Sequence, residues 1–355
     1  MSTTSKSPKK VAAVAYDMAR ETLPEHSHRY SPKKYTQPQL LVCLVLRAFF
    51  KTEYRGIVEI LNDCPDLCQV FGLQTVPHFT TLQKASKRLL RLATAERLLD
   101  RTLETLVPDR HVALAAIDST GLEARHISRY FVSQRRSKQF EIREIRHCRR
   151  WPKLALACDC RNHAILSAIT TRGPSVDVNQ FCKVLQPATE KVRMDCVLAD
   201  AGYDSEGNHR YARQCHHIET IIPAKLGRPT TKLPRGLYRR QMRTHFDQER
   251  YGQRWQVETT FSMIKRNYGS ALRAKHYWSQ CREMLLLVLT HNIAIILSLK
   301  ELFYRAFQTG LASGVPFSDV AFSDNVQDLA SFDLSATTSC PRAPRLNRRG
   351  KIQSG

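Results

Sequence analysis

Apolar residues recur at helical spacing in the N-terminal third of the chain. From Thr36 onward, Pro38 stands in a first helical turn and the run LLVCLVLRAFF follows it, which predicts a helix bound for a core. Three further helices are expected over 53–61, 79–92 and 94–106. Residues 1–35 are polar and basic without a sustained period, so we expect a flexible basic arm there.

Beyond Pro108 short apolar runs alternate with helical segments. Strands are expected over 111–118, 153–160, 163–170, 195–200 and 219–223. The second and third of these runs are joined by the turn-like sequence DCRN, so they should form a hairpin. Helices are expected over 178–185, 205–215 and 250–268. A hairpin followed by alternating helices and strands predicts an α/β fold with a mixed sheet flanked by helices.

The longest apolar stretch, 284–299, lies near the C-terminal side of this α/β region. It carries His291 and Asn292 near its middle, so it is too short and too polar for a membrane span. We expect a buried helix and no membrane partner. After this helix, residues 301–355 form an extension rich in Ser, Asp and Ala with a basic end, and we expect its tail to be disordered.

The net charge of the chain indicates which class of partner it binds. The 355 residues include 55 Lys and Arg against 32 Asp and Glu, a formal net charge of +23. The hydrophobic fraction of 42% and charged fraction of 25% are globular values, which excludes disorder of the whole chain. So large a positive charge repels itself unless an anionic partner binds. Nucleic acid neutralises it best, and an acidic membrane surface is the weaker alternative.

The cysteines favour a reducing compartment. There are eleven, an odd number at scattered spacings, which argues against a secreted disulfide framework. Cys64 and Cys68 are close in sequence, as are Cys158 and Cys160, but no second pair stands at zinc-finger distance, so we expect buried thiols. The start MSTTSKSPKK lacks the apolar core of a signal peptide, and we expect a cytoplasmic protein.

Basic residues gather on one predicted helix and in two predicted loops. One face of the helix over 79–92 carries Lys84, Lys87, Arg88 and Arg91, which recur at helical spacing. That face either contacts a DNA backbone or is simply solvated. The Arg-rich segments 125–151 and 224–248 should form loops that rim one side of the sheet, and we expect Arg135 and Arg136 of the first loop to bind DNA.

Two aspartates end predicted strands. Asp118 is followed by Ser-Thr, and Asp200 begins the sequence DAGYDS. The carboxyl ends of strands face the crevice where α/β sheets bind ligands. A single aspartate at such a position is commonly a turn residue, whereas two of them also suit a paired metal site.

The helix over 250–268 carries an acid, two cations and a phenol on one stripe. These are Tyr251, Arg254, Glu258 and Lys265. At about 100° per residue, all four fall within a stripe about 60° wide. Such a helix can pack on the sheet and direct its carboxylate toward the two aspartates. The alternative is a surface helix with an ion pair between Arg254 and Glu258.

Together these residues resemble the DDE transposases of bacterial and archaeal insertion sequences. Asp118 in a strand, Asp200 in LADAGYDS and the spacing Tyr-x2-Arg-x3-Glu-x6-Lys occur in the order of the family's motif. The continuations VETTFSMIKR and HNIAIIL also look like that family, and the resemblance covers about 36–299. It implies an RNase H-like catalytic domain over 109–300 behind an all-helical DNA-binding region over 36–108.

The resemblance also implies a chemistry. It assigns three catalytic residues that bind metal, Asp118, Asp200 and Glu258. Oxygen ligands favour two Mg²⁺ ions, for which Mn²⁺ can substitute. One ion would activate water or a DNA 3′-hydroxyl, and the other would stabilise the leaving oxygen. By the same resemblance three residues hold phosphates of double-stranded DNA, namely Tyr251, Arg254 and Lys265.

The implied function is transposition of an insertion sequence. The enzyme would bind the terminal inverted repeats and cut and join DNA as a homodimer, because two element ends must be held together, in a nucleoid-associated location. Two alternatives are a DNA-binding copy that has lost catalysis and a nuclease acting on RNA hybrids or DNA junctions. The complete motif argues against the first, and the N-terminal helices argue against the second. Asp159 and Asp204 are expected to be structural.

Overall fold

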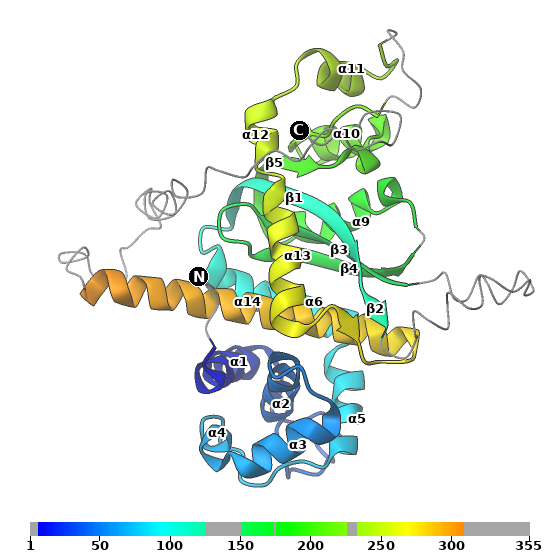
Figure 1. The fold of residues 1–355 in the computed structure, drawn as a ribbon. Coiled ribbons are helices and arrows are strands. Elements are labelled where there is room, and N and C mark those ends of the chain that lie inside the picture. Colours follow the sequence, from blue (N-terminus) through cyan, green and yellow to red (C-terminus); the bar gives the residue numbers. More distant parts are fainter. Residues whose placement is uncertain (1–5, 125–150, 174, 226–232, 309–355) are drawn as a thin grey trace, which may run out of the picture. The chain divides into compact units, whose positions relative to one another are not determined.

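The computed structural model describes residues 6–124, 151–173, 175–225 and 233–308 (Figure 1). Residues 1–301 form one compact unit. The regions 36–108 and 109–300 both lie within this unit and share a hydrophobic core. The chain therefore changes from a helical to an α/β topology near residue 108, while the hydrophobic core continues across that point.

Six helices precede the sheet in the described part of the chain. They are α1 (Pro8–Thr22), α2 (Gln37–Phe49), α3 (Tyr54–Asp63), α4 (Pro65–Gln69), α5 (Phe79–Leu89) and α6 (Leu92–Leu106). The start of α2 is fixed locally, because Thr36 and Gln39 form a reciprocal capping box and Pro38 stands in the first turn. Helices α2, α3 and α5 pack on one another.

The expectation of a flexible arm over 1–35 was wrong for residues 8–22. These form α1, which begins at the cap residue Ser7 and packs on α2 and α6. Its buried face consists of Val11, Ala12, Ala15, Met18 and Ala19. The period is hard to see in the sequence because three of these five residues are alanines, whose side chains are only weakly apolar.

A five-stranded mixed sheet forms the centre of the fold. Its strands are, in spatial order, β4 (Ile165–Arg172), β3 (Pro152–Asp159), β1 (His111–Gly121), β5 (Arg193–Ala199) and β6 (Glu219–Ile221). β3 is antiparallel to both of its neighbours, while β1, β5 and β6 are parallel. The predicted hairpin and mixed sheet are confirmed, and the fold is RNase H-like. A separate two-stranded sheet joins β2 (Glu123–Ala124) to β7 (Ala271–Leu272).

Helices cover both faces of the sheet. Ala116 of β1 belongs to the core that includes α13 (Trp255–Tyr268) and α14 (Tyr277–Gln308), whereas Ala115 and Ile117 belong to the core with α9 (Phe181–Thr189). In Figure 1 α13 crosses in front of the sheet. Every residue of β3 is buried, as expected for a strand covered on both faces.

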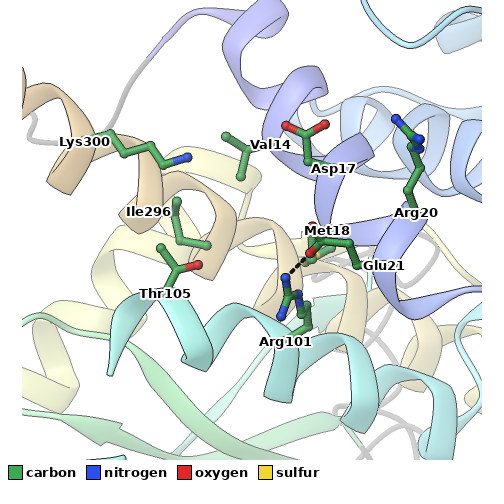
Figure 2. A pocket seen from close by; sticks show the side chains of 9 residues that line it. All are labelled: Val14, Asp17, Met18, Arg20, Glu21, Arg101, Thr105, Ile296 and Lys300. Carbon is green, nitrogen blue, oxygen red and sulfur yellow. Dashed lines mark hydrogen bonds and ion pairs between the residues drawn. The ribbon is translucent and has the colours of Figure 1, made fainter. Parts of the chain in front are cut away.

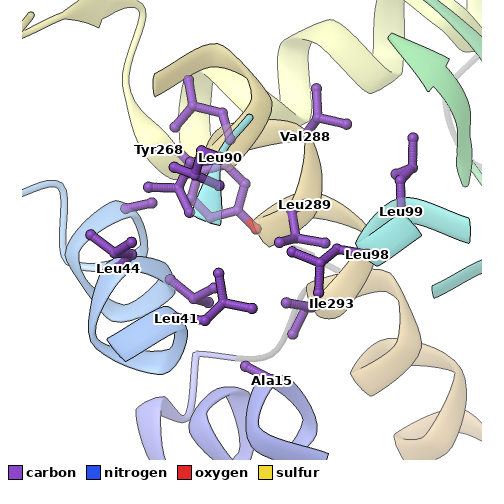
Figure 3. Close-up of a cluster of buried hydrophobic side chains, with 14 of the residues drawn as sticks. Ala15, Leu41, Leu44, Leu90, Leu98, Leu99, Tyr268, Val288, Leu289 and Ile293 are labelled. Atoms are coloured by element: carbon purple, nitrogen blue, oxygen red, sulfur yellow. The ribbon is translucent and has the colours of Figure 1, made fainter. Parts of the chain in front are cut away.

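The N-terminal helices and the C-terminal helix meet in one apolar cluster (Figure 3). Leu41 and Leu44 of α2 lie in this cluster with Leu98 of α6, and Val288 and Ile293 of α14 complete it. Because these segments are far apart in sequence, the cluster ties the helical region to the helices that cover the sheet.

Helix α14 is longer than the predicted 284–299. The part Tyr277–Leu302 has the length and hydropathy of a membrane span, but 78% of its most apolar window is buried inside the protein. Asn292 explains how polar residues fit there. Its side-chain oxygen accepts from the N–H of Ile165 at 2.9 Å, and its amide nitrogen donates to the Ile165 carbonyl at 3.0 Å and to Thr102 Oγ1 at 2.9 Å.

Three helical segments differ from expectation. The predicted helix over 250–268 is divided into α12 (Gln248–Gly252) and α13, with Gln253 and Arg254 between them. The segment 205–215 consists of α10 (Glu206–Arg210) and a π-helical turn (Tyr211–Cys215). The predicted loop over 224–248 contains α11 (Leu237–Thr244), whose one buried residue, Met242, leaves almost no apolar period to detect.

Replacement of Asn292 by Leu should destabilise the fold. It leaves the N–H and carbonyl of Ile165 without partners in a dry environment, where each unsatisfied group costs about 1–3 kcal/mol. We expect the free energy of unfolding, measured by urea denaturation, to fall by about 2–4 kcal/mol. The same change at the exposed Asn62 should alter it by less than about 0.5 kcal/mol. Equal effects at both positions would contradict this role of Asn292.

Candidate active site

The register of two parallel strands makes Asp118 and Asp200 neighbours. Ile117 of β1 lies opposite Ala199 of β5, so the next residue of each strand is one of the two aspartates. β1 continues to Gly121 because β3 pairs with it that far, whereas β5 stops at Ala199. Asp118 is therefore three residues from the end of its strand, beside the point where β5 ends, and not at the strand's last residue as predicted.

The chain after β5 fixes the orientation of Asp200. Asp200 caps the 3-10 turn η2 (Ala201–Tyr203), and its Oδ1 accepts from the N–H of Gly202. A Cβ atom on Gly202 would lie 2.7 Å from that same oxygen, so a larger residue could not make this turn without moving the carboxylate. The small residues after Asp200 thus have a definite role.

Arg254 links two of the three predicted carboxylates. Its Nη2 donates to Glu258 Oε1 at 2.5 Å, and its Nη1 lies 3.6 Å from Asp118 Oδ2. The Glu258 side chain is 58% exposed, in the first turn of α13. The ion pair expected for a plain surface helix is present, but it also reaches the sheet, so Glu258 lies on the aspartate side of α13.

The three acids do not converge on a common point in this arrangement. Among the described residues, no group of three or more His, Cys, Asp or Glu side chains is placed to hold a metal ion. A guanidinium lies between Asp118 and Glu258 instead. The donors are nevertheless hard carboxylate oxygens, two of them on adjacent strand positions, which is the chemistry that Mg²⁺ and Mn²⁺ prefer.

Burial and like charge disfavour ionisation of Asp118. The pKa of Asp118 is raised to about 6, mainly by burial and also by the neighbouring Asp200 carboxylate, while the backbone N–H of Ser119 lowers it. Arg254 lowers the pKa, and Asp177 raises it. A cation at this position would reduce the electrostatic repulsion between the two adjacent carboxylates.

In sequence, Tyr251 precedes Arg254 and Glu258, and Lys265 follows them. Tyr251 packs its ring on Phe246 with centroids 4.9 Å apart, and burial raises the pKa of its phenol. The Asp200 and Asp118 carboxylates act on the same phenol, so it lies near both. Lys265 Nζ donates to Thr120 Oγ1 at 2.6 Å, two residues beyond Asp118 on β1, and burial lowers its pKa.

A family model described as the transposase DDE domain matches residues 113–293. The chain belongs to this family. The matched region begins in β1 and ends in α14, so it contains both aspartates and Glu258. Membership supports a function in DNA transposition, and transposases of this family bind DNA and generally use divalent metals.

The transposase has polar residues beside the aspartates that sequence reasoning missed. Asp177 begins the 3-10 turn η1 (Asp177–Asn179) and accepts from Ser119 Oγ at 2.7 Å. It also forms an ion pair with Lys153, which is 9% exposed. The only available signal was Lys153 itself, a single lysine at the start of an otherwise apolar strand.

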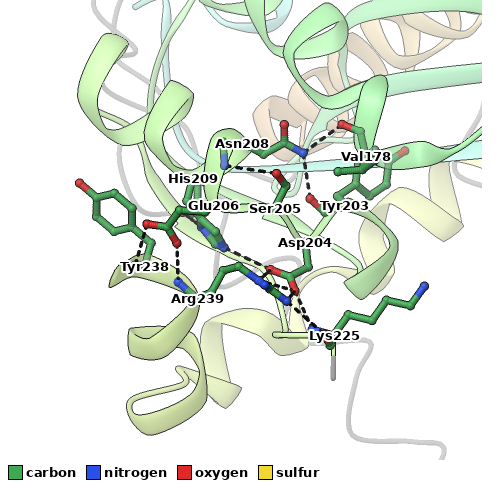
Figure 4. A network of polar contacts seen from close by, with 12 residues as sticks. Val178, Tyr203, Asp204, Ser205, Glu206, Asn208, His209, Lys225, Tyr238 and Arg239 are labelled. Carbon is green, nitrogen blue, oxygen red and sulfur yellow. Dashed lines mark hydrogen bonds and ion pairs between the residues drawn. The ribbon is translucent and has the colours of Figure 1, made fainter. Parts of the chain in front are cut away.

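The two aspartates expected to be structural make local contacts in the transposase. Asp159 accepts from the N–H of Arg161 at 2.8 Å in the β3–β4 turn, and burial raises its pKa to about 6. The Asp204 side chain is fully buried and accepts from Arg239 Nη2 at 2.7 Å and from the N–H of Lys225 at 2.7 Å (Figure 4). The Asp204 ion pair anchors α11 to the chain that follows Asp200.

The predicted DNA-contacting cations of α5 differ in their surroundings. Lys84 and Lys87 are exposed, as is Arg91 beyond the end of the helix. Arg88 is half-buried and donates from Nε to Gln37 Oε1 at 3.1 Å, so it ties α5 to α2. Arg135 and Arg136 lie outside the described residues, and their role in DNA binding stays a prediction.

A cavity of about 530 Å³ lies between α1, α6 and α14, and Asp118, Asp200 and Glu258 do not line it (Figure 2). Both charged and apolar side chains line it, and two of the lining residues, Arg101 and Glu21, form an ion pair. None of the described residues predicted for catalysis or DNA binding lines this cavity. Its mixed lining identifies no particular ligand.

Asp118→Asn should stabilise the transposase in EDTA above pH 6. The pKa of Asp118 is raised from 3.8 to about 6 on folding, so the folded state binds this proton more tightly and loses stability as pH rises between those values. At about 1.4 kcal/mol per pKa unit, the free energy of unfolding of the variant should exceed that of the wild type by about 2–3 kcal/mol at pH 7.5.

The difference from wild type should vanish near pH 4, where the carboxyl is protonated in both states. Asp66→Asn, at an exposed position on α4, serves as the control and should leave the pH profile unchanged. Thermal and urea unfolding from pH 4 to 8 measure both variants. A destabilised Asp118→Asn at pH 7.5 would contradict the electrostatic account of the site.

Proposed function

We propose that this transposase cuts the ends of its own insertion sequence and joins them to target DNA. The observation that carries the proposal is the placement of Asp118 and Asp200 at adjacent positions of paired parallel strands, with Glu258 connected to Asp118 through Arg254. Two adjacent, partly buried carboxylates repel each other, and a bound cation would compensate that repulsion.

The three carboxylates would hold two divalent cations, Mg²⁺ or Mn²⁺. The oxygen donor set fits such ions, and the raised pKa of Asp118, to about 6, is the condition that a bound cation reverses. Bound divalent cations would supply activation of an attacking hydroxyl and charge stabilisation at the leaving oxygen. The protein's own contribution is to hold the carboxylates in place and to bind the DNA strand.

Arg254 would have two positions in this mechanism. Without metal, its guanidinium compensates the charges of Asp118 and Glu258. With divalent cations held by the carboxylates, the guanidinium would be free to contact a phosphate oxygen, for which its planar fork is suited. The Tyr251 phenol would donate to the same phosphate region, and Lys265 would hold a phosphate farther along β1. These roles would be those of the Tyr-Arg-Glu-Lys subgroup of the family, to which we propose the chain belongs.

DNA binding would extend over the helical region. The exposed Lys84 and Lys87 of α5 would contact the terminal inverted repeats, and the unusual net charge of +23 supports a polyanionic partner. Because two element ends must be joined in one reaction, the active form on DNA would be a homodimer. Such an enzyme would act in the cytoplasm at the nucleoid.

Cleavage of a duplex that spans one predicted terminal repeat tests the proposal. In Mg²⁺ or Mn²⁺, the wild type should nick the repeat boundary and leave a 3′-hydroxyl. Asp200→Asn and Glu258→Gln should reduce this nick to background, because each removes one carboxylate charge. Glu249→Gln, at an exposed acid on α12, is the matched control and should cleave normally.

Binding of the repeat without cleavage in any metal would contradict the catalytic proposal. It would support the alternative of a DNA-binding copy that has lost its chemistry. Cleavage that survives Asp200→Asn and Glu258→Gln would show instead that the active site lies elsewhere in the chain.

Lys84→Ala combined with Lys87→Ala should weaken repeat binding and its dependence on salt. Each phosphate contact contributes about 0.9 to the slope of log K against log salt concentration, so the double variant should lower the slope by about 2. Fluorescence anisotropy from 50 to 200 mM KCl measures it. Lys183→Ala on α9, also exposed, is the control. An unchanged slope in the double variant would remove α5 from the DNA interface.

A further inference from the structure

Asp177 lies behind the two catalytic aspartates and is held by two partners. Ser119 Oγ donates to its Oδ1 at 2.7 Å, and the Lys153 ammonium forms an ion pair with the same oxygen. Lys153 also donates to the Ser175 carbonyl at 3.0 Å, so its position is fixed independently of Asp177. A buried lysine aimed at one carboxylate makes that carboxylate tolerable beside the acidic centre.

The alternation of β1 explains how Asp177 reaches Asp118. Successive residues of a strand point to opposite faces, so Ser119 faces α9 and Asp118 faces α13. The backbone N–H of Ser119 donates to Asp118 Oδ1 at 2.7 Å. Asp177 therefore holds the side chain of Ser119, whose backbone in turn holds the Asp118 carboxylate.

The turn that begins with Asp177 is also fastened to the turn that begins with Asp200. Asn208, which is buried, donates to the carbonyl of Val178 in η1 at 3.0 Å and to that of Tyr203 in η2 at 2.9 Å (Figure 4). A Cβ on Gly202 would lie 3.8 Å from the Asp177 Cβ, which shows how closely the two turns approach. The short turn η1 thus contacts Ser119, which follows Asp118, and is linked to η2, which follows Asp200.

We propose that Asp177, neutralised by Lys153, is a positioning residue that sets the affinity of the Asp118–Asp200 pair for divalent cations. It acts through Ser119 and through the contact of η1 with η2, and it binds no metal itself. Repulsion between two adjacent carboxylates tends to drive them apart, and this brace opposes that movement by fixing Ser119 and by fastening η1 to η2. The inference rests on the proposed metal-dependent function.

Binding of Mn²⁺ to the full chain in the absence of DNA tests this inference. The electron paramagnetic resonance signal of free Mn²⁺ reports binding directly and does not depend on catalysis. Groups that orient metal ligands typically contribute about 10–100-fold to metal affinity. We expect Asp177→Ala to weaken Mn²⁺ binding by about that factor and Ser119→Ala by about tenfold.

The structure offers a matched control for loss of a buried ion pair. Lys191 and Glu96 are paired with side chains 9% and 24% exposed, against 11% and 34% for Lys153 and Asp177. Glu96→Gln should reduce stability in the same way as Asp177→Ala and leave Mn²⁺ affinity at the wild-type value. A purely structural Asp177 would behave like Glu96.

A double variant tests the route through Ser119. If Asp177 acts on Asp118 through this hydroxyl, Asp177→Ala combined with Ser119→Ala should bind Mn²⁺ no more weakly than Asp177→Ala alone. Additive losses would overturn the relay. Should Asp177→Ala fail to fold, Ser119→Ala, which removes only a hydroxyl, decides the question by itself.

The outcomes separate this inference from the function on which it rests. Wild-type Mn²⁺ affinity in Asp177→Ala and Ser119→Ala, alongside a large loss in Asp118→Asn, would overturn the inference and leave the metal site in place. Mn²⁺ binding that is absent from the wild type, or unaffected by Asp118→Asn, would overturn the proposed metal site and the inference with it.

Discussion

Two carboxylates held side by side at the end of a pair of parallel strands are the constraint on which the rest of this structure depends. The register that places Ile117 opposite Ala199 makes Asp118 and Asp200 adjacent, and burial together with the Asp200 charge raises the pKa of Asp118 to about 6. Opposite charge has to come from other elements. Arg254, at the start of α13, supplies it in the metal-free protein.

That requirement explains why α13 must be held firmly against the sheet. At its far end the Tyr268 hydroxyl donates to the Thr290 carbonyl of α14 at 3.2 Å, and Lys51 donates to the carbonyl of Arg266 at 2.8 Å. Helix α14 in turn clamps β4 through Asn292. The N-terminal region, proposed to bind DNA, therefore also helps to fix the helix that carries Glu258, through Lys51 just after α2.

Much of this arrangement is predictable from the sequence, since periodicity reports burial. The succession of strands along the chain and the buried helix follow from the apolar runs. The approach of Asp118 to Asp200 follows because each ends an apolar run that forms a strand. Alanine-rich α1 was missed because its apolar face is weak, and the break after Gly252 because the motif residues fit one continuous helix equally well. Asp177 was invisible, because its contacts with Ser119 and Lys153 join segments that only the folded sheet brings together.

A crystal structure of the transposase with Mn²⁺ and a DNA end would show directly whether the three carboxylates hold the metal. We expect anomalous scattering from Mn²⁺ in contact with the carboxylates of Asp118, Asp200 and Glu258, and an Arg254 guanidinium that has left Glu258 for a phosphate. Mn²⁺ bound elsewhere, with Arg254 still paired to both acids, would contradict it.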